Sequence, residues 1–369
     1  MESVFAEGRE LAERVGDVDG EIALHLGYAT VLGFGGDIRG YHSIAREAAA
    51  LVDDTVSRGA AAVALVMMEY SSRCLGPLRD ASKFAEQALE LSAGDPLMGV
   101  ETAGFSVWST MLQGSAESYS LRGRLDDARS RIAEAFEVVR SHDMPEPLVW
   151  SLFVSTRIAD FSGDAAPAPR AAEARHNALE AVRIAEASGN HFLRVFGHRA
   201  LATAHAIHGD WHGASTSVAE ALAIARQHTG LEREGELLAE LSRAQLGEGE
   251  TELARATAEE AIACSRRQGS LFFECEGQLA LARALRASPG QSAARAIEAC
   301  LDRALELVRD SDAHVFEPQI LEECARLAAL CGDGAAASEG LGRARAAYSK
   351  IGATGHSARL AKELALGEL

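Results

Sequence analysis

The stretch LATAHAIHGDWHGASTSVAEAL, residues 201–222, contains a spacing of small residues that recurs elsewhere in the chain. In it, Ala202, Gly209, Ala214 and Ala221 follow one another with gaps of 7, 5 and 7 residues. Amphipathic helical patterns lie on both sides of the glycine. A glycine there ends the first helix, because it can adopt the left-handed conformation that caps a helix. The stretch therefore predicts two antiparallel helices joined by a short loop.

Three further sets of small residues show the same gaps. They are Ala116, Gly123, Ala128 and Ala135; Ser242, Gly249, Ala254 and Ala261; and Ala325, Gly332, Ala337 and Ala344. Two helices that interlock closely need small residues where their axes approach, because little more than a methyl group fits there. Bulky residues such as Trp211, two positions after the glycine, then fill the wider spaces between helices.

The hairpins repeat with a period of about 40 residues. Glycines that end the second helices, Gly189, Gly230 and Gly269, lie 41 and 39 residues apart. Residues 1–369 are predicted to form a single array. Its expected parts are a lone helix over 1–16, about eight hairpins over 17–352 and a C-terminal capping helix over 353–369. Two hairpins have enlarged loops, around DAAPAPRAAEA (164–174) and RASPGQSA (286–293).

This small residue–Gly–Ala–Ala pattern resembles the tetratricopeptide repeat (TPR), in a variety longer than the common 34-residue form. The resemblance implies an all-α fold, a right-handed superhelical solenoid of about eight TPR-like hairpins. Strand-type runs with period-two alternation are nearly absent from the sequence, which agrees with an all-α chain.

A more specific resemblance lies in GDPLMG (94–99), VWST (107–110), LRGRLDDARS (121–130) and the tail YSKIGATGHSARLAKELA (348–365). The segment 249–285 carries the same resemblance. These resemble the C-terminal TPR region of multidomain bacterial class III adenylate/guanylate cyclases, in which a cyclase domain and an AAA/STAND-type ATPase domain precede the repeats. The resemblance implies a regulatory or sensory role. The opening helix ELAERVGD looks like the second helix of a repeat, so the chain is expected to be a fragment of a longer protein.

Composition narrows the function classes. The formal net charge of −18 disfavours binding to nucleic acid or to an anionic membrane surface. No apolar run reaches the length of a membrane span. Six cysteines lie in alanine-rich helical stretches without a CxxC pair, as in a reduced, cytoplasmic protein. No cofactor is expected.

Catalytic signatures are missing from the sequence. It contains no GxxxxGK[ST], HExxH or GxSxG motif, so the chain is predicted not to be an enzyme. The best metal candidate is the cluster of His198, His205 and His208, which one helical face could carry. The alternative, which we favour, is that His205 packs between helices and His208 flanks an exposed loop. No metal site is therefore predicted.

Arginine occupies the position after the first small residue in four hairpins, at Arg157, Arg243, Arg283 and Arg326. We call these four residues the arginine ladder. The resemblance to TPR folds places this position on the concave groove, together with Thr203 at the equivalent position and the neighbouring Arg199. Arginine there suits a carboxylate, a phosphate or an acidic peptide. The alternative is structural pairing, with Glu322 four residues before Arg326 and Glu240 three before Arg243.

Three function classes remain open. The favoured one is a non-catalytic scaffold that binds a protein or peptide, with an acidic segment as the candidate ligand, and regulates an attached cyclase- or ATPase-type effector. The second is a small-molecule-sensing pocket, as in long-TPR transcription regulators. The third, a metal-dependent enzyme using the histidines, is disfavoured. Acidic stretches such as EREGE (232–236) are expected to be solvated.

Overall fold

The computed structural model describes residues 2–164, 169–288 and 293–367. In these ranges the chain is all-helical, and eight hairpins follow the leading helix α1 (Glu2–Val15), which confirms the predicted fold. Hairpins 1 to 8 are, in order, α2 (Val18–Phe34) with α3 (Ile38–Ala50), α4 (Arg58–Leu75) with α5 (Leu78–Ser92), α7 (Val107–Leu121) with α8 (Leu125–Ser141), α9 (Pro145–Ser162) with α10 (Pro169–Ser188), α11 (His191–Ile207) with α12 (Trp211–Gln227), α13 (Glu234–Gly247) with α14 (Thr251–Gln268), α15 (Leu271–Ala287) with α16 (Ala294–Ser311), and α17 (Glu317–Leu330) with α18 (Gly334–Lys350). Helix α19 (Thr354–Leu366) ends the array.

Two short helices lie in links between hairpins and were not predicted. They are α6 (Val100–Ala103) and the 3₁₀ helix η1 (Leu231–Arg233). Both enlarged loops contain residues outside the described ranges, 165–168 and 289–292. None of the described helices combines the length and the apolar character that crossing a membrane requires.

The small residues lie where the helices of a hairpin meet. Ala202, Ala214 and Ala221 are at most 3% exposed, and the alanines of the other three sets are buried as well. Trp211 packs its ring against Gly247, on the first helix of the next hairpin, where a side chain would collide with it. Each first helix also contacts the second helix of the hairpin before it, so the hairpins stack as a continuous solenoid.

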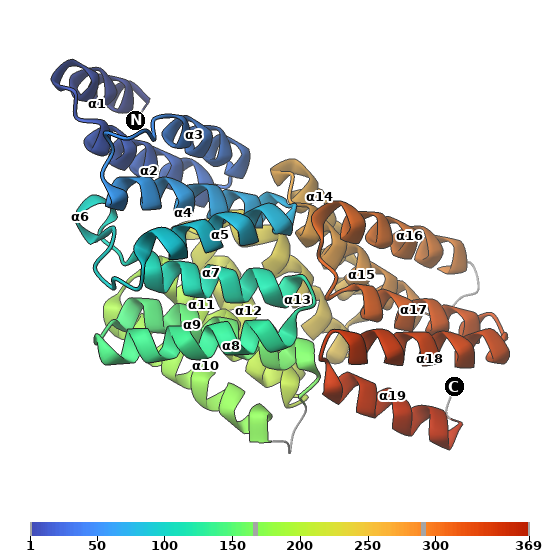
Figure 1. The fold of residues 1–369 in the computed structure, drawn as a ribbon. Coiled ribbons are helices and arrows are strands. Elements are labelled where there is room, and N and C mark those ends of the chain that lie inside the picture. The colour runs from blue at the N-terminus through green and yellow to red at the C-terminus, as the bar shows by residue number, and fades with distance from the viewer. Residues whose placement is uncertain (1, 165–168, 289–292, 368–369) are drawn as a thin grey trace.

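The solenoid closes on itself after about one superhelical turn. Backbone atoms in the loops of hairpins 1 to 4 contact the links that precede hairpins 6, 7, 8 and α19. We call this line of contacts the seam; its pairs are Phe34 with Gly230, Cys74 with Ser270, Leu121 with Val315, and Gly163 with Gly355. The loops of hairpins 1 to 3 therefore meet the links that precede hairpins 6 to 8, five positions later, and the loop of hairpin 4 meets the start of α19 (Figure 1).

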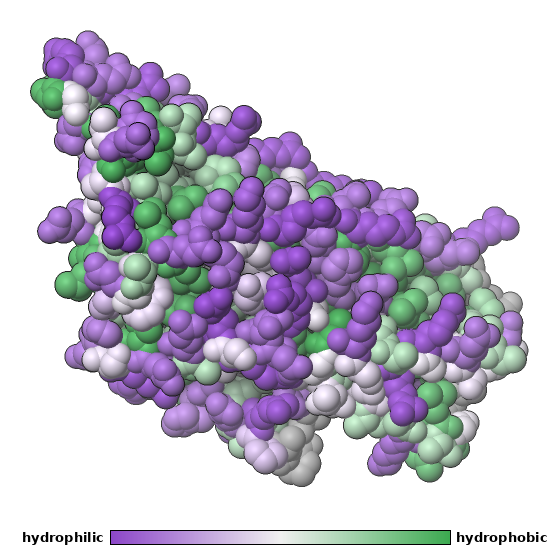
Figure 2. Space-filling view, viewed as in Figure 1, coloured by the Kyte–Doolittle hydropathy of each residue, from purple (hydrophilic) through white to green (hydrophobic). Residues whose placement is uncertain are grey.

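Several seam contacts are hydrogen bonds between main chains. Gly230 N donates to Phe34 O at 3.2 Å, and Val315 N donates to Leu121 O at 3.0 Å. A bidentate ion pair of Arg79 with Asp312, at 2.7 and 2.9 Å, lies beside them. The face of the molecule over α5, α7 and α8 is largely hydrophilic (Figure 2). The first helices consequently surround an enclosed axis rather than an open groove.

Candidate functional site

The arginine ladder lies on first helices that face the axis. Arg157 is in α9 and Arg243 in α13, whereas Arg283 is in α15 and Arg326 in α17. Arg157 is 5% exposed. A charged side chain that is removed from water in this way requires an opposite charge nearby.

Carboxylates from other hairpins provide this charge for Arg157. Its guanidinium donates to Glu240 at 2.7 Å, Glu236 at 3.2 Å and Glu276 at 3.4 Å. Arg199, which is fully buried, shares two of these partners, with N–O distances of 2.7 Å to both Glu236 and Glu240. Arg157 and Arg199 are thus held by this carboxylate cluster within the protein.

The pKa of Glu236 reflects these interactions. Burial alone would raise it, but Arg199, Arg233 and Arg157 lower the pKa of Glu236 to about 2. Thr203 takes part only locally, because its hydroxyl donates to the backbone oxygen of Arg199 at 3.0 Å. These residues therefore form the structural core of the axis.

The other ladder arginines are also paired. Arg326 forms the expected pair with Glu322, at 3.3 Å, and a second pair with Glu363 of α19. The predicted pair of Arg243 with Glu240 is wrong. Arg243 instead donates to both oxygens of Asp160, at 2.7 and 2.9 Å. Glu240 instead faces the more deeply buried arginines described above.

Arg283 binds acceptors on the next hairpin. It donates to Glu323 at 3.1 Å and to Gln319 at 3.0 Å, and its side chain is still 26% exposed. Unlike Arg157 and Arg199, it therefore keeps part of its surface accessible. Arg243, with a side-chain exposure of 40%, has the same property.

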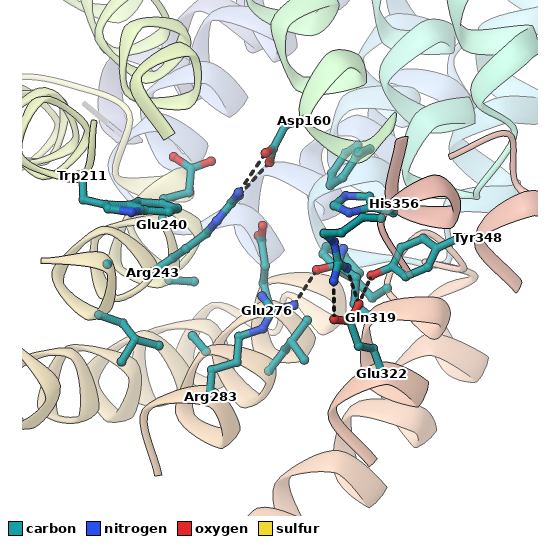
Figure 3. Close-up of a pocket in the computed structure, with 18 residues that line it drawn as sticks. Asp160, Trp211, Glu240, Arg243, Glu276, Arg283, Gln319, Glu322, Tyr348 and His356 are labelled. Atoms are coloured by element: carbon teal, nitrogen blue, oxygen red, sulfur yellow. Dashed lines mark hydrogen bonds and ion pairs between the residues drawn. The ribbon is translucent and has the colours of Figure 1, made fainter. Parts of the chain in front are cut away.

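Arg243 and Arg283 line a pocket of about 320 Å³ at the C-terminal end of the axis, which we call the charged pocket (Figure 3). Its charged lining residues are Asp160, Glu240, Arg243, Glu276, Arg283, Glu322 and Arg359. They belong to α9, α13, α15, α17 and α19, so both sides of the seam contribute. The pocket therefore presents both signs of charge to any occupant.

Glu276 has unusual surroundings in this pocket. Its Oε2 atom is buried without a hydrogen-bond partner among the described residues. Burial, together with repulsion from Glu236 and Glu240, outweighs Arg157 and raises the pKa of Glu276 to about 7. Nearby, burial lowers the pKa of His356, and this imidazole stacks on the Tyr348 ring at 4.7 Å. Glu276 is consequently a carboxyl group of raised pKa in the lining of the pocket, with a side chain that is 15% exposed.

The histidines singled out from the sequence have separate partners. His198 contacts Glu186 at 3.1 Å, whereas His205 contacts Asp210 at 2.7 Å. His208 contacts the backbone oxygen of Ala204 at 2.8 Å. Over residues 2–164, 169–288 and 293–367, no group of three or more His, Cys, Asp or Glu side chains is arranged to hold a metal ion.

The expectation for EREGE is wrong. Glu232, Arg233 and Glu236 are each at most 1% exposed, because η1 and the start of α13 lie against the first superhelical turn. Arg233 contacts Glu117 at 3.3 Å, more than one hundred residues away in sequence. A sequence signal exists for some missed carboxylates: Glu236 and Glu276 each lie seven residues, two helical turns, before a ladder arginine and so on the same face.

Comparison with known proteins supports the fold. No family model matches the chain, and no curated protein matches its sequence. A Rap protein solved in complex with competence and sporulation factor matches with a TM-score of 0.55 at 14% identity, over 94% of this chain and 99% of that protein. The fold is thus that of TPR-like helical-repeat proteins.

A second solved structure is a signal transduction ATPase with numerous domains from Pyrococcus horikoshii, which carries a tetratricopeptide repeat sensor. It matches with a TM-score of 0.42 at 15% identity, over 89% of this chain and 46% of that protein. This chain thus spans about half the length of that ATPase. At such identities the likeness concerns the fold alone.

Proposed function

We propose that this chain is a non-catalytic sensor scaffold whose charged pocket binds a protein or peptide partner through an acidic segment. The observation that carries this proposal is the pocket itself, where Arg243 and Arg283 stay partly exposed among residues from both sides of the seam. A carboxylate from a partner would compete with Asp160 for Arg243 and with Glu323 for Arg283. A basic group of the same partner would meet Glu276.

Binding of a partner in the charged pocket would change the stability of the contacts along the seam. Asp160 belongs to α9, whereas His356 and Arg359 belong to α19, and these two helices contact each other across the two superhelical turns. A partner that displaces Asp160 from Arg243 therefore changes the interaction between the first and second superhelical turns. Such a two-state contact is what a sensor requires, because a ligand shifts an equilibrium only by its differential affinity for the two states.

The resemblance to cyclase-associated repeat regions supports the proposal that this scaffold regulates an attached effector domain. In this proposal, binding of the partner in the charged pocket alters the seam, and the altered seam changes the activity of an attached signalling domain of the nucleotide cyclase or ATPase type. We place the protein in the cytoplasm, which agrees with the free thiols of Cys74, Cys264, Cys275, Cys300, Cys324 and Cys331.

Fluorescence anisotropy with a labelled hexaglutamate peptide tests the binding step. We expect Arg243→Ala and Arg283→Ala each to weaken binding about tenfold, as expected for loss of a charge-assisted contact. Arg255→Ala is the matched control, because Arg255 is similarly exposed, at 41%, but lies on the outer helix α14. Equal affinities for all four proteins would refute the pocket as the acidic-segment site.

The regulatory step is tested on the protein that carries the effector. Nucleotide cyclisation or ATP hydrolysis should respond to the partner in the wild type and in Arg255→Ala. The response should be lost in Arg283→Ala. An unchanged response in Arg283→Ala would remove the proposed link between this pocket and the effector.

A further inference from the structure

A second cavity lies at the N-terminal end of the axis. It has a volume of about 560 Å³, within the range typical of small-molecule sites. First helices from five successive hairpins, α2, α4, α7, α9 and α11, form its wall. We call it the aromatic cavity after its rings, which are Phe34, Tyr41, Tyr70, Phe105, Trp150 and Phe192.

The rings are arranged as a continuous apolar wall. Phe34 stacks on Phe192 with centroids 4.4 Å apart, although these residues come from hairpins 1 and 5. Trp150 stacks on Phe196 at 4.7 Å and meets Tyr70 edge-on at 6.5 Å. Offset stacking and edge contacts of this kind are the geometries that aromatic rings prefer, so a flat ring of a ligand would extend them.

Two polar atoms in this wall have no hydrogen-bond partner among the described residues. They are Oε2 of Glu69, a residue only 1% exposed, and Nε1 of Trp150. A buried donor or acceptor left in this state costs about 1–3 kcal/mol.

Charge in the cavity favours a neutral ligand. Glu69 Oε1 accepts from Arg73 Nε at 2.7 Å, and Arg73 Nη1 donates to Glu117 at 2.6 Å. Glu117 also pairs with Arg233 at 3.3 Å, so the two carboxylates and the two guanidinium groups neutralise one another. Arg73 also lies 5.6 Å from the Trp150 ring. Because these pairs leave no net charge in the wall, the cost of dehydrating a charged ligand would not be recovered there, and Glu146, exposed at the rim, disfavours an anion further.

We infer that the aromatic cavity binds an uncharged, aromatic small molecule. This site is separate from the charged pocket, and the inference does not depend on the proposed partner. A chain of buried ion pairs joins the two: Glu69, Arg73, Glu117, Arg233, Glu236, Arg157 and Glu276 follow one another across the axis.

Two fluorescent probes that differ by one charge test the inference on the full chain. N-phenyl-1-naphthylamine is neutral and has one N–H donor, whereas 8-anilinonaphthalene-1-sulfonate is the same ring system with an added sulfonate. We expect the neutral probe to bind saturably at one site. The anionic probe should bind about tenfold more weakly, because it brings a negative charge beside Glu69.

Substitution of a glycine in the cavity wall locates the probe. A Cβ at Gly27 of α2 meets nothing within 4 Å, so Gly27→Phe fills the cavity without a collision near the main chain. Gly342→Phe is the matched control, since Gly342 is also an exposed helical glycine with open space, on α18. We expect about a tenfold loss of affinity for the neutral probe in Gly27→Phe and none in Gly342→Phe.

Circular dichroism and thermal unfolding check that both variants fold like the wild type. A neutral probe that binds folded Gly27→Phe as tightly as the wild type would overturn the inference, because it would lie elsewhere. Equal affinity for both probes would overturn the assignment of an uncharged ligand. Failure of the neutral probe to bind the wild type at all would overturn the site.

Discussion

Buried arginine side chains lie along the axis of this superhelix and depend on carboxylates from distant hairpins. Such pairs often contribute little net stability compared with apolar residues, because both charges lose their hydration. Removing only one member is different, since the other charge is then left in the interior without a partner. Arg199 and Glu276 of the axis lead to two different predictions, one for the loss of a buried charge and one for its dependence on pH.

Arg199→Met should destabilise the protein by about 3 kcal/mol or more, because Glu236 and Glu240 lose a shared buried partner. Methionine keeps much of the side-chain volume, so the loss would reflect charge. Arg175→Ala, on the exposed face of α10, should change stability by no more than about 0.5 kcal/mol. Urea unfolding measures both, and similar stabilities would show that Arg199 is not needed to hold these carboxylates.

Glu276 predicts a dependence on pH. Its pKa rises from an ordinary value of 4.5 to about 7 on folding, so the folded chain holds this proton more tightly than the unfolded chain. The contribution of Glu276 to stability is therefore present below pH 4.5 and is lost as pH rises through 7. The limiting slope for one group is about 1.4 kcal/mol per pH unit.

Glu276→Gln should remove this component, because glutamine does not titrate. Unfolding free energies at several values between pH 4.5 and 7.5 should fall more steeply for the wild type than for the variant. Asp160, whose pKa Arg243 holds at about 2 against the effect of burial, acts in the opposite sense: its stabilisation is fully present above about pH 4 and is lost as pH falls through 2, outside this window. Parallel pH profiles for the two proteins would contradict the role assigned to Glu276.

Hairpins are the elements that the sequence predicts best. Their small residues act locally, through contacts within one hairpin or with the next, so spacing alone reveals them. Local reasoning also finds the pair of Glu322 with Arg326, one helical turn apart. It fails for Arg243, whose partner Asp160 is 83 residues away, because the position of that carboxylate depends on rotations accumulated over several hairpins.

Loop glycines of equivalent position should differ in their tolerance of a side chain. Gly123 and Gly332 both have positive φ, 72° and 84°. A Cβ at Gly123 would approach Ile351 across the seam to 2.9 Å, whereas one at Gly332 meets nothing within 4 Å. Gly332→Ala should cost about 1–2 kcal/mol, the penalty of the left-handed conformation.

Gly123→Ala should cost more than Gly332→Ala, because the seam must also shift. Thermal and urea unfolding of the two variants give the difference directly. Equal losses would mean that the seam at Ile351 yields without cost, and would weaken the view that the two superhelical turns are tightly packed.

Across the whole molecule, the seam changes how stability is distributed. In an open solenoid each repeat contacts only its neighbours, and the ends fray first. Here the two superhelical turns are joined along the seam and also through the axis, where the hydroxyl of Tyr70 on hairpin 2 donates to Glu232 in the link before hairpin 6 at 2.8 Å. No periodicity in the sequence could reveal this pairing, since superhelical pitch is a sum of many small angles.

Hydrogen exchange should detect the coupling between turns. Tyr70→Phe leaves a buried carboxylate without its donor, which costs about 1–3 kcal/mol, and should accelerate amide exchange in both α4 and α13. Tyr119→Phe removes a similar bond, of 2.7 Å to Glu86 on the adjacent hairpin, and should act only on hairpins 2 and 3. An effect of Tyr70→Phe confined to hairpins 1 to 3 would argue against coupling.

The five-hairpin offset of the seam also fixes which hairpins of the array must lie next to each other across the two superhelical turns. Open solenoids accept an inserted or deleted repeat, because only two interfaces need to be restored. In this chain, a hairpin added between hairpins 4 and 5 would shift the partner of every seam loop by one repeat at once. The number of repeats between those loops and their partner links is therefore constrained as it is in a closed ring, although the ends of the chain are not joined.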